Sequence, residues 1–145
     1  MNGDVLPILL VEDNPDDVLI TKRAWKKGQI KNELCVVNDG EEALRFLHKK
    51  GDYSDAQTPC LILLDLKMPK SDGFEVLENI KNDEEMKRIP VIVLTSSDRP
   101  ADIERAYALG CNSYIVKPVN FDKFIKALLE IENYWLVICK IPATS

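Results

Sequence analysis

Short runs of apolar residues recur five times along the chain, and they consist mainly of Val, Ile and Leu. Within these runs, polar residues do not alternate with the apolar ones. That pattern is typical of strands buried on both faces, as in the middle of a parallel sheet. The sequence therefore predicts five strands, at residues 5–11, 34–37, 60–64, 91–94 and 114–116.

The segments between these runs carry apolar residues at the spacing of one helix face. Asn14 followed by Pro15 matches a helix N-cap and first helical position, and Asn120 precedes the last segment. We therefore predict five helices. Their apolar faces include Val18, Leu19 and Trp25; Ala43, Leu44 and Leu47; Val76, Leu77 and Ile80; Ile103, Ala106 and Tyr107; and Phe121, Phe124, Ile125 and Leu128.

Strands that alternate with helices predict one α/β domain built on a parallel sheet. Because crossovers between parallel strands are right-handed, helices are expected on both faces of that sheet. Residues 51–59 indicate a surface loop. The length of 145 residues, with 46% hydrophobic and 30% charged residues, agrees with a single globular domain.

Polar side chains follow four of the five predicted strands. In chain order they are Glu12 and Asp13; Asp65; Thr95, Ser96 and Ser97; and Lys117. Because ligands of open parallel sheets bind beyond the carboxyl ends of the strands, we expect these residues at one edge. Crowded carboxylates repel one another unless a cation neutralises them, and an all-oxygen set without His or Cys suits Mg²⁺. The sequence thus predicts a Mg²⁺ site, with the lysine as a second fixed positive charge and the threonine as a hydrogen-bond donor.

Each of these residues also has an ordinary structural explanation. Asp16 and Asp17 fall in the first turn of the first predicted helix, where acids are stabilised by the helix dipole, and we expect no more of them. For the other candidates the alternatives are Glu12 and Asp13 as further helix-start acids, Asp65 in a turn, Thr95 as a helix cap and Lys117 on an exposed loop. Their joint occurrence after successive strands favours the site.

The charge balance bears on the class of partner. With 24 acidic and 19 basic residues, the chain has a formal net charge of -5. Non-specific binding to nucleic acid or to an anionic membrane requires an excess of Lys and Arg, so neither partner is expected. No apolar run approaches the roughly 20 residues of a membrane span. The four cysteines lack metal-binding spacing and are expected to be reduced, as in a cytoplasmic protein.

The residues around the strand ends form four strings in a definite order. They are Leu10-Val11-Glu12-Asp13-Asn14; Leu64-Asp65-Leu66-Lys67-Met68-Pro69 with Asp72-Gly73; Leu94-Thr95-Ser96-Ser97; and Tyr114-Ile115-Val116-Lys117-Pro118. Across about residues 5–131, they resemble the receiver domain of two-component response regulators. The resemblance implies a doubly wound, flavodoxin-like fold with strand order 2-1-3-4-5. It also implies a receiver domain at residues 1–131 and a C-terminal extension at 132–145, without a separate output domain.

In that family, the aspartate matching Asp65 accepts a phosphoryl group from a phosphohistidine of a sensor kinase, and its carboxylate is the nucleophile. The resemblance implies Mg²⁺ held by Asp13, Asp65 and the backbone carbonyl of Lys67, with Glu12 acting through a water molecule. Lys117 would neutralise charge on the phosphoryl oxygens. Its peptide bond to the following proline is typically cis in this family.

The resemblance also implies a second, phosphorylated state. The hydroxyl of Thr95 would move to bond the phosphoryl group, and the ring of Tyr114 would turn into the vacated space. Ser96 is small enough to admit the phosphate. The side chains of Lys67 and Ser97 would flank the path of attacking water and tune the lifetime of the acyl phosphate. The output surface would comprise the fourth helix, the fifth strand and the fifth helix.

The function predicted from this resemblance is that of a signalling protein rather than an enzyme, with output by protein contact or by phosphate relay to a histidine phosphotransfer protein. The 51–59 loop and Tyr134-Trp135-Leu136 make the chain similar to single-domain regulators that serve bacterial phytochromes, so a phytochrome-type kinase is one candidate partner. The apolar residues of the extension either pack back on the domain or cover a partner or a second copy of the chain. A homodimer is the preferred hypothesis.

Three other functions fit part of the pattern. A phosphatase of the haloacid dehalogenase type also uses a strand-end aspartate and Mg²⁺, but it needs a second aspartate two positions later, where this chain has Lys67. A flavodoxin-like mononucleotide carrier needs a Ser-, Thr- or Gly-rich phosphate loop where Glu12 and Asp13 stand. A receiver kept only as a scaffold is disfavoured, because all the expected site residues are present.

Overall fold

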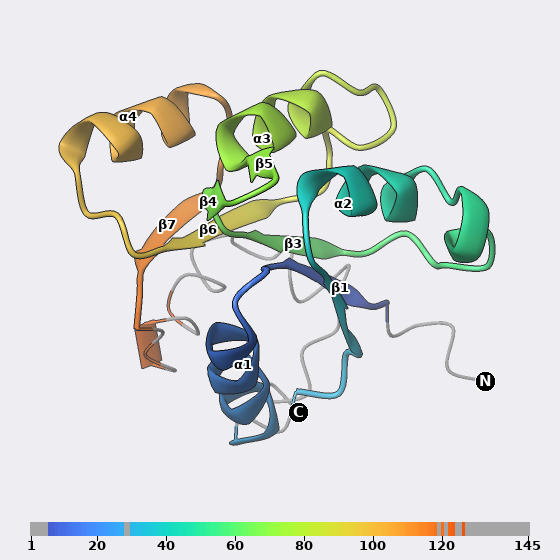
Figure 1. The fold of residues 1–145 in the computed structure, drawn as a ribbon, viewed down its shortest axis with the longest axis horizontal. Helices are drawn as coiled ribbons and strands as arrows, with labels where there is room; N and C mark the ends of the chain where they lie inside the picture. The colour runs from blue at the N-terminus through green and yellow to red at the C-terminus, as the bar shows by residue number, and fades with distance from the viewer. Residues whose placement is uncertain (1–5, 28–29, 119, 121, 124–125, 127–145) are drawn as a thin grey trace.

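Five parallel strands form the central sheet of the protein (Figure 1). The structure is a computed structural model that describes residues 6–27, 30–118, 120, 122–123 and 126. The strands are β1 (Ile8–Val11), β2 (Leu34–Val37), β3 (Leu61–Leu64), β6 (Val91–Thr95) and β7 (Ser113–Val116). They lie in the order β2-β1-β3-β6-β7, which confirms the predicted order 2-1-3-4-5 once β6 and β7 are counted as the fourth and fifth strands.

Four α-helices cover the sheet in the part of the chain that the structure describes: α1 (Pro15–Lys27), α2 (Gly40–Leu47), α3 (Gly73–Lys81) and α4 (Pro100–Ala108). Figure 1 shows α1 on one face and the other three helices on the opposite face, as the doubly wound fold requires. The sequence predicted five helices, and the fifth, expected after Asn120, lies largely outside the described residues. None of the described helices is long and apolar enough to cross a membrane.

Successive strand residues point to opposite faces of the sheet and supply two hydrophobic cores. Leu9, Val11, Ile62 and Leu64 pack in the core under α2, α3 and α4, and Ile8, Leu10, Leu61 and Leu63 pack in the core that includes Trp25 of α1. The three central strands are buried along their whole length. The edge strands β2 and β7 are partly exposed, so the prediction that all five are fully buried was wrong for these two. Among the described strands, each edge strand has a neighbour on only one side, which leaves part of it accessible to solvent.

One prediction about a helix face was wrong. Tyr107, placed on the apolar face of the fourth helix, is 49% exposed. The buried residue of α4 is Ala106. The loop predicted at residues 51–59 begins with a 3-10 helix, η1 (Gly51–Tyr53).

The cysteines also differ from expectation. Cys35 and Cys111 are free thiols, as predicted. Cys60 is in a disulfide, so the prediction of four reduced cysteines was wrong for this residue. Pairing depends on the separation of two cysteines in space, which their separation along the chain does not reveal.

Candidate functional site

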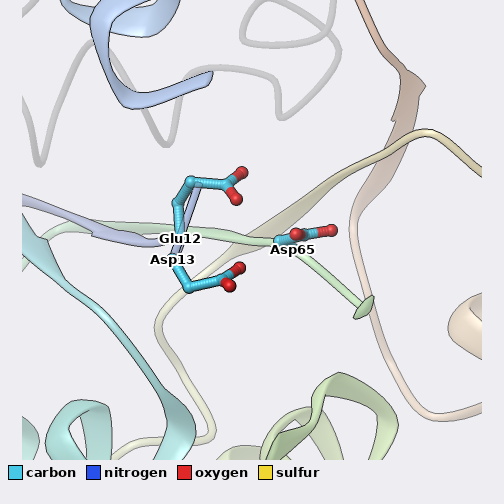
Figure 2. Close-up of side chains that lie close together, drawn as sticks. All are labelled: Glu12, Asp13 and Asp65. Carbon is cyan, nitrogen blue, oxygen red and sulfur yellow. The ribbon is translucent and has the colours of Figure 1, made fainter. Parts of the chain in front are cut away.

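The register of the central strands brings three carboxylates to one edge of the sheet. Val11 pairs with Leu64, so the residues that follow them, Glu12 and Asp65, leave the sheet side by side. Carboxylate oxygens of Glu12, Asp13 and Asp65 all lie within 4.8 Å of one another. Figure 2 shows Glu12 and Asp13 diverging from the end of β1 beside Asp65 at the end of β3. The structure therefore places the three acids of the strand ends in one acidic cluster.

Lys117 reaches this cluster from the end of β7. Its backbone amide donates to the carbonyl of Thr95 at 2.8 Å, which continues the pairing of β6 with β7. Its ammonium nitrogen lies 2.6 Å from Glu12, 2.9 Å from Asp17 and 3.6 Å from Asp65. The side chain is only 12% exposed, and the bond to the following proline is cis. A buried positive charge thus faces three carboxylates.

Burial and hydrogen bonding shift the pKa values of Glu12 and Lys117. Burial raises the pKa of Glu12 above its usual range; the hydrogen bond from Lys117 acts in the opposite direction, and the charge of Asp65 raises the pKa further. Burial alone would lower the pKa of Lys117, but hydrogen bonds to Glu12 and Asp17 leave it above the usual lysine value. The ammonium therefore stays protonated at neutral pH, and burial together with the charge of Asp65 makes it harder to ionise Glu12.

An open cleft of about 680 Å³ lies over the acidic cluster, and Ser96 and Lys117 are among the residues that line it. One wall is a hairpin of two antiparallel strands, β4 (Lys67–Met68) and β5 (Ser71–Asp72). The backbone amide of Lys67 donates to Oδ1 of Asp65 at 3.2 Å, and the exposed Lys67 side chain lies at the cleft. The cleft gives a ligand of phosphate size direct access to Asp65.

Thr95, Ser97 and Tyr114 lie behind this cleft rather than in its lining. Thr95 is fully buried, and its Oγ1 accepts a hydrogen bond from the amide of Ser97 at 3.4 Å. The Ser97 hydroxyl donates to Asp102 of α4 at 2.6 Å, and the Ser97 carbonyl accepts from the hydroxyl of Tyr114 at 2.9 Å. The loop after β6 is therefore tied to both α4 and β7. The predicted role of Ser97 in tuning the lifetime of the acyl phosphate stays a prediction. In this structure its hydroxyl faces Asp102 rather than the cleft.

Asp17 is the site residue that the sequence analysis missed. Its amide donates to the Asn14 side chain at 3.3 Å, so it belongs to the capped first turn of α1, as predicted. Its carboxylate also accepts a hydrogen bond from Lys117. The signal in the sequence is an acid in the first helical turn after the strand-end pair, and that signal does not distinguish Asp17 from Asp16.

Comparison with known proteins places this site in a family. Residues 8–129 match the family model of the response regulator receiver domain. The response regulator Rcp1 of Synechocystis sp. is 42% identical over 136 residues, which cover 94% of this chain and 92% of Rcp1. A probable methanogenesis regulatory protein, FilR2 of Methanothrix harundinacea, is 41% identical over 143 residues, covering 93% of this chain and 90% of FilR2.

Solved structures agree with these matches. The bacteriophytochrome response regulator AtBRR is 46% identical, with a TM-score of 0.81 over 88% of this chain and 93% of its own. The phosphorylated cyanobacterial phytochrome response regulator RcpA is 41% identical, with a TM-score of 0.78 over 95% of this chain and 99% of its own. The Mn²⁺-bound form of Rcp1 is 41% identical, with a TM-score of 0.76 over 94% and 99%. By sequence, fold and the arrangement of its strand-end residues, this chain belongs to the response regulator receiver family.

Proposed function

We propose that this protein is a response regulator in which Asp65 accepts a phosphoryl group from a sensor histidine kinase in the presence of Mg²⁺. The observation that carries the proposal is the position of Asp65 in an open cleft, next to two further carboxylates and a buried ammonium group. A relative of 41% identity is described in phosphorylated form, which supports the same chemistry here.

The donor set of the acidic cluster fits Mg²⁺. The cluster offers three carboxylates without His or Cys, and Mg²⁺ prefers oxygen ligands and keeps several waters. Asp13, Asp65 and the carbonyl of Lys67 would hold the ion directly, and Glu12 would act through a water molecule. Rcp1 is described with bound Mn²⁺, another ion that carboxylates suit. When bound, Mg²⁺ supplies positive charge that offsets the negative charge of the phosphoryl oxygens.

The residues of this chain supply positioning and charge for the transfer. One oxygen of Asp65 accepts the amide hydrogen of Lys67, and the other lies 3.6 Å from the Lys117 ammonium. A carboxylate oxygen of Asp65 forms the new O–P bond while the N–P bond of the phosphohistidine breaks, and the electron pair of that bond stays on the imidazole nitrogen. Lys117 remains protonated and stabilises the charge on the phosphoryl oxygens. The product is an acyl phosphate.

The output of the switch would run through the loop after β6. Phosphorylation replaces the single negative charge of the Asp65 carboxylate with a phosphoryl group that carries about one and a half to two negative charges. The Thr95 hydroxyl would turn to the phosphoryl group beside the small Ser96, and Tyr114, now half-buried and bonded to Ser97, would change its packing. The altered surface would bind a downstream protein or a histidine phosphotransfer protein. The extension at residues 132–145 and the predicted homodimer contact lie outside the described residues.

The relatives bear on the identity of the kinase. AtBRR and RcpA are named for phytochromes, which favours a phytochrome-type histidine kinase in the cytoplasm as the phosphodonor. FilR2 has the same 41% identity as RcpA and is named for methanogenesis, so a kinase unrelated to light is the second candidate.

The test is intact mass spectrometry after incubation with acetyl phosphate. We expect one phosphoryl group per chain, dependent on Mg²⁺ and lost in Asp65→Asn. Asp55→Asn removes the same charge from an exposed position in the 51–59 segment and should label like the unchanged protein. Labelling that persists in Asp65→Asn, or that proceeds equally well with EDTA, would contradict the proposal.

A further inference from the structure

The Lys117 ammonium has two close carboxylate partners, and only one of them belongs to the acidic cluster. Glu12, at 2.6 Å, is a member of the cluster. Asp17, at 2.9 Å, comes from the first turn of α1 and is not a member. Both distances are those of charge-assisted hydrogen bonds, which are stronger than neutral ones. Both carboxylates bind the same lysine, but Glu12 also belongs to the acidic cluster, whereas Asp17 does not.

Asn14 fixes both partners relative to each other. Its amide donates to Oε2 of Glu12 at 3.2 Å, which leaves Oε1 for Lys117. Its side-chain oxygen accepts from the amide of Asp17 at 3.3 Å and so anchors the backbone from which the Asp17 side chain extends. The Asp17 side chain is 29% exposed and Lys117 is 12% exposed, so their bond lies at the edge of the cleft rather than in bulk solvent.

Charge separates the roles of the two acids. A cation bound among Glu12, Asp13 and Asp65 would attract the Glu12 carboxylate and repel the nearby ammonium of Lys117. Both effects would weaken the ion pair between Glu12 and Lys117. Asp17 lies outside that set, so its carboxylate can still accept a hydrogen bond from Lys117 when a cation is present. An ammonium group has three N–H donors. With one directed at Glu12 and one at Asp17, the third is left for Asp65 or for a phosphoryl oxygen attached to it.

We propose that Asp17 is a positioning residue that holds the Lys117 ammonium beside Asp65, and that it does so whether or not a cation occupies the acidic cluster. This inference rests on the proposed function for its kinetic consequence. The contact itself joins α1 to β7 across the sheet edge, so the orientation of the lysine depends on how α1 is seated.

The kinetic test compares two neighbouring acids of α1. Asp16 shares the first turn with Asp17, and its amide donates to the same Asn14 oxygen at 2.8 Å. Its side chain is exposed, and among the described residues the ion pairs of Lys117 are with Glu12, Asp17 and Asp65, not with Asp16. Asp17→Asn should slow phosphorylation of Asp65 by acetyl phosphate and Mg²⁺ roughly three- to tenfold. This is less than the full cost of a charge-assisted hydrogen bond, because Glu12 still holds the ammonium and the Asp17 side chain is partly exposed. Asp16→Asn should stay within about twofold of the unchanged protein, and Asp17→Glu should recover part of the rate. Equal rates for Asp17→Asn and Asp16→Asn would overturn the proposal.

Two further measurements exclude a merely structural effect. In a Lys117→Ala background, Asp17→Asn should have no additional effect on the rate, and the same slowing there would overturn the proposal. In ¹H–¹⁵N spectra of lysine ammonium groups, with the Lys117 signal assigned by its loss in Lys117→Ala, Asp17→Asn should speed hydrogen exchange of that signal with water. Asp16→Asn should leave the signal unchanged. An unchanged signal in Asp17→Asn refutes the contact even if the chain takes no phosphate, whereas absence of labelling with the expected spectra counts against the proposed function alone.

Discussion

Replacing Gly73 with alanine is predicted to disturb Asp65 through packing alone. Gly73 is the first residue of α3, and a Cβ there would lie 2.4 Å from the Cα of Leu66 and 2.6 Å from the carbonyl oxygen of Asp65. Both contacts are with backbone atoms, which cannot turn away as the end of a flexible side chain can. The segment that carries the phosphoacceptor must therefore move to admit one methyl group.

The cost in stability follows from two opposing effects. Inserting a methyl group into a well-packed position costs about 1–3 kcal/mol. Alanine in place of glycine in a helix returns up to about 1 kcal/mol, and less than that at the first position. We therefore expect the free energy of unfolding of Gly73→Ala to fall by about 1–2 kcal/mol. Urea denaturation followed by circular dichroism measures this difference.

The same displacement should also slow phosphorylation of Asp65. A displacement of about 1 Å in a reacting group can cost up to a hundredfold in rate, so we expect at least about tenfold slower labelling by acetyl phosphate. Gly51→Ala is the matched control. Its φ of +59° makes alanine strained, by about 1–2 kcal/mol, but nothing lies within 4 Å of the new Cβ. Normal labelling of Gly73→Ala, or equal slowing in Gly51→Ala, would refute the reasoning.

Two further predictions concern side-chain hydrogen bonds outside the acidic cluster. The Tyr53 hydroxyl donates to Glu42 at 2.8 Å, and burial, helped by that bond, raises the pKa of Tyr53 from 10.0 to about 12. The folded state thus keeps a proton that the unfolded state loses, so stability should fall as pH rises from about 10 to about 12, and urea titrations of Tyr53→Phe should lack this part of the decline. Asp102→Asn weakens the acceptor that holds the Ser97 hydroxyl at 2.6 Å. If the released hydroxyl orients attacking water, the acyl phosphate should decay about twofold faster or more, and an unchanged decay rate would show that Ser97 has no such role.

The arrangement of the strand ends could be predicted from sequence because it depends on topology. In a parallel sheet all carboxyl ends lie at one edge, and here the register is nearly level: Val11 pairs with Leu64, and Thr95 pairs with Val116. The polar residues that directly follow these strands can therefore be predicted to lie close together, even when their side-chain conformations are not known. The same logic explains why the central strands were recognised, since burial on both faces leaves an uninterrupted apolar run.

The remaining contacts depend on features that no periodic pattern encodes. The β4–β5 hairpin has two residues in each strand, too few to show alternation. Ser97 follows Thr95 by two positions, yet its hydroxyl turns to α4, a choice set by where Asp102 lies in the folded chain. Tyr107 lies four residues after Ile103, which is the spacing of one helix face, but its side chain is 49% exposed, whereas the adjacent Ala106 is buried.

The choice between Asp16 and Asp17 shows where prediction from sequence ends and structure becomes necessary. The two acids are adjacent, share one helical turn and have amides bonded to the same Asn14 side chain. Composition and spacing therefore cannot predict which of the two contacts Lys117. They differ because successive residues of a helix point about 100° apart, and the seating of α1 on the sheet directs one of them to Lys117. The apolar side chains of α1 hold the helix on the sheet: Val18 packs against the core beneath it, and Trp25, about two turns from Asp17, is buried in that core. The charge environment of the phosphorylation site is therefore determined partly by apolar packing at the far end of α1.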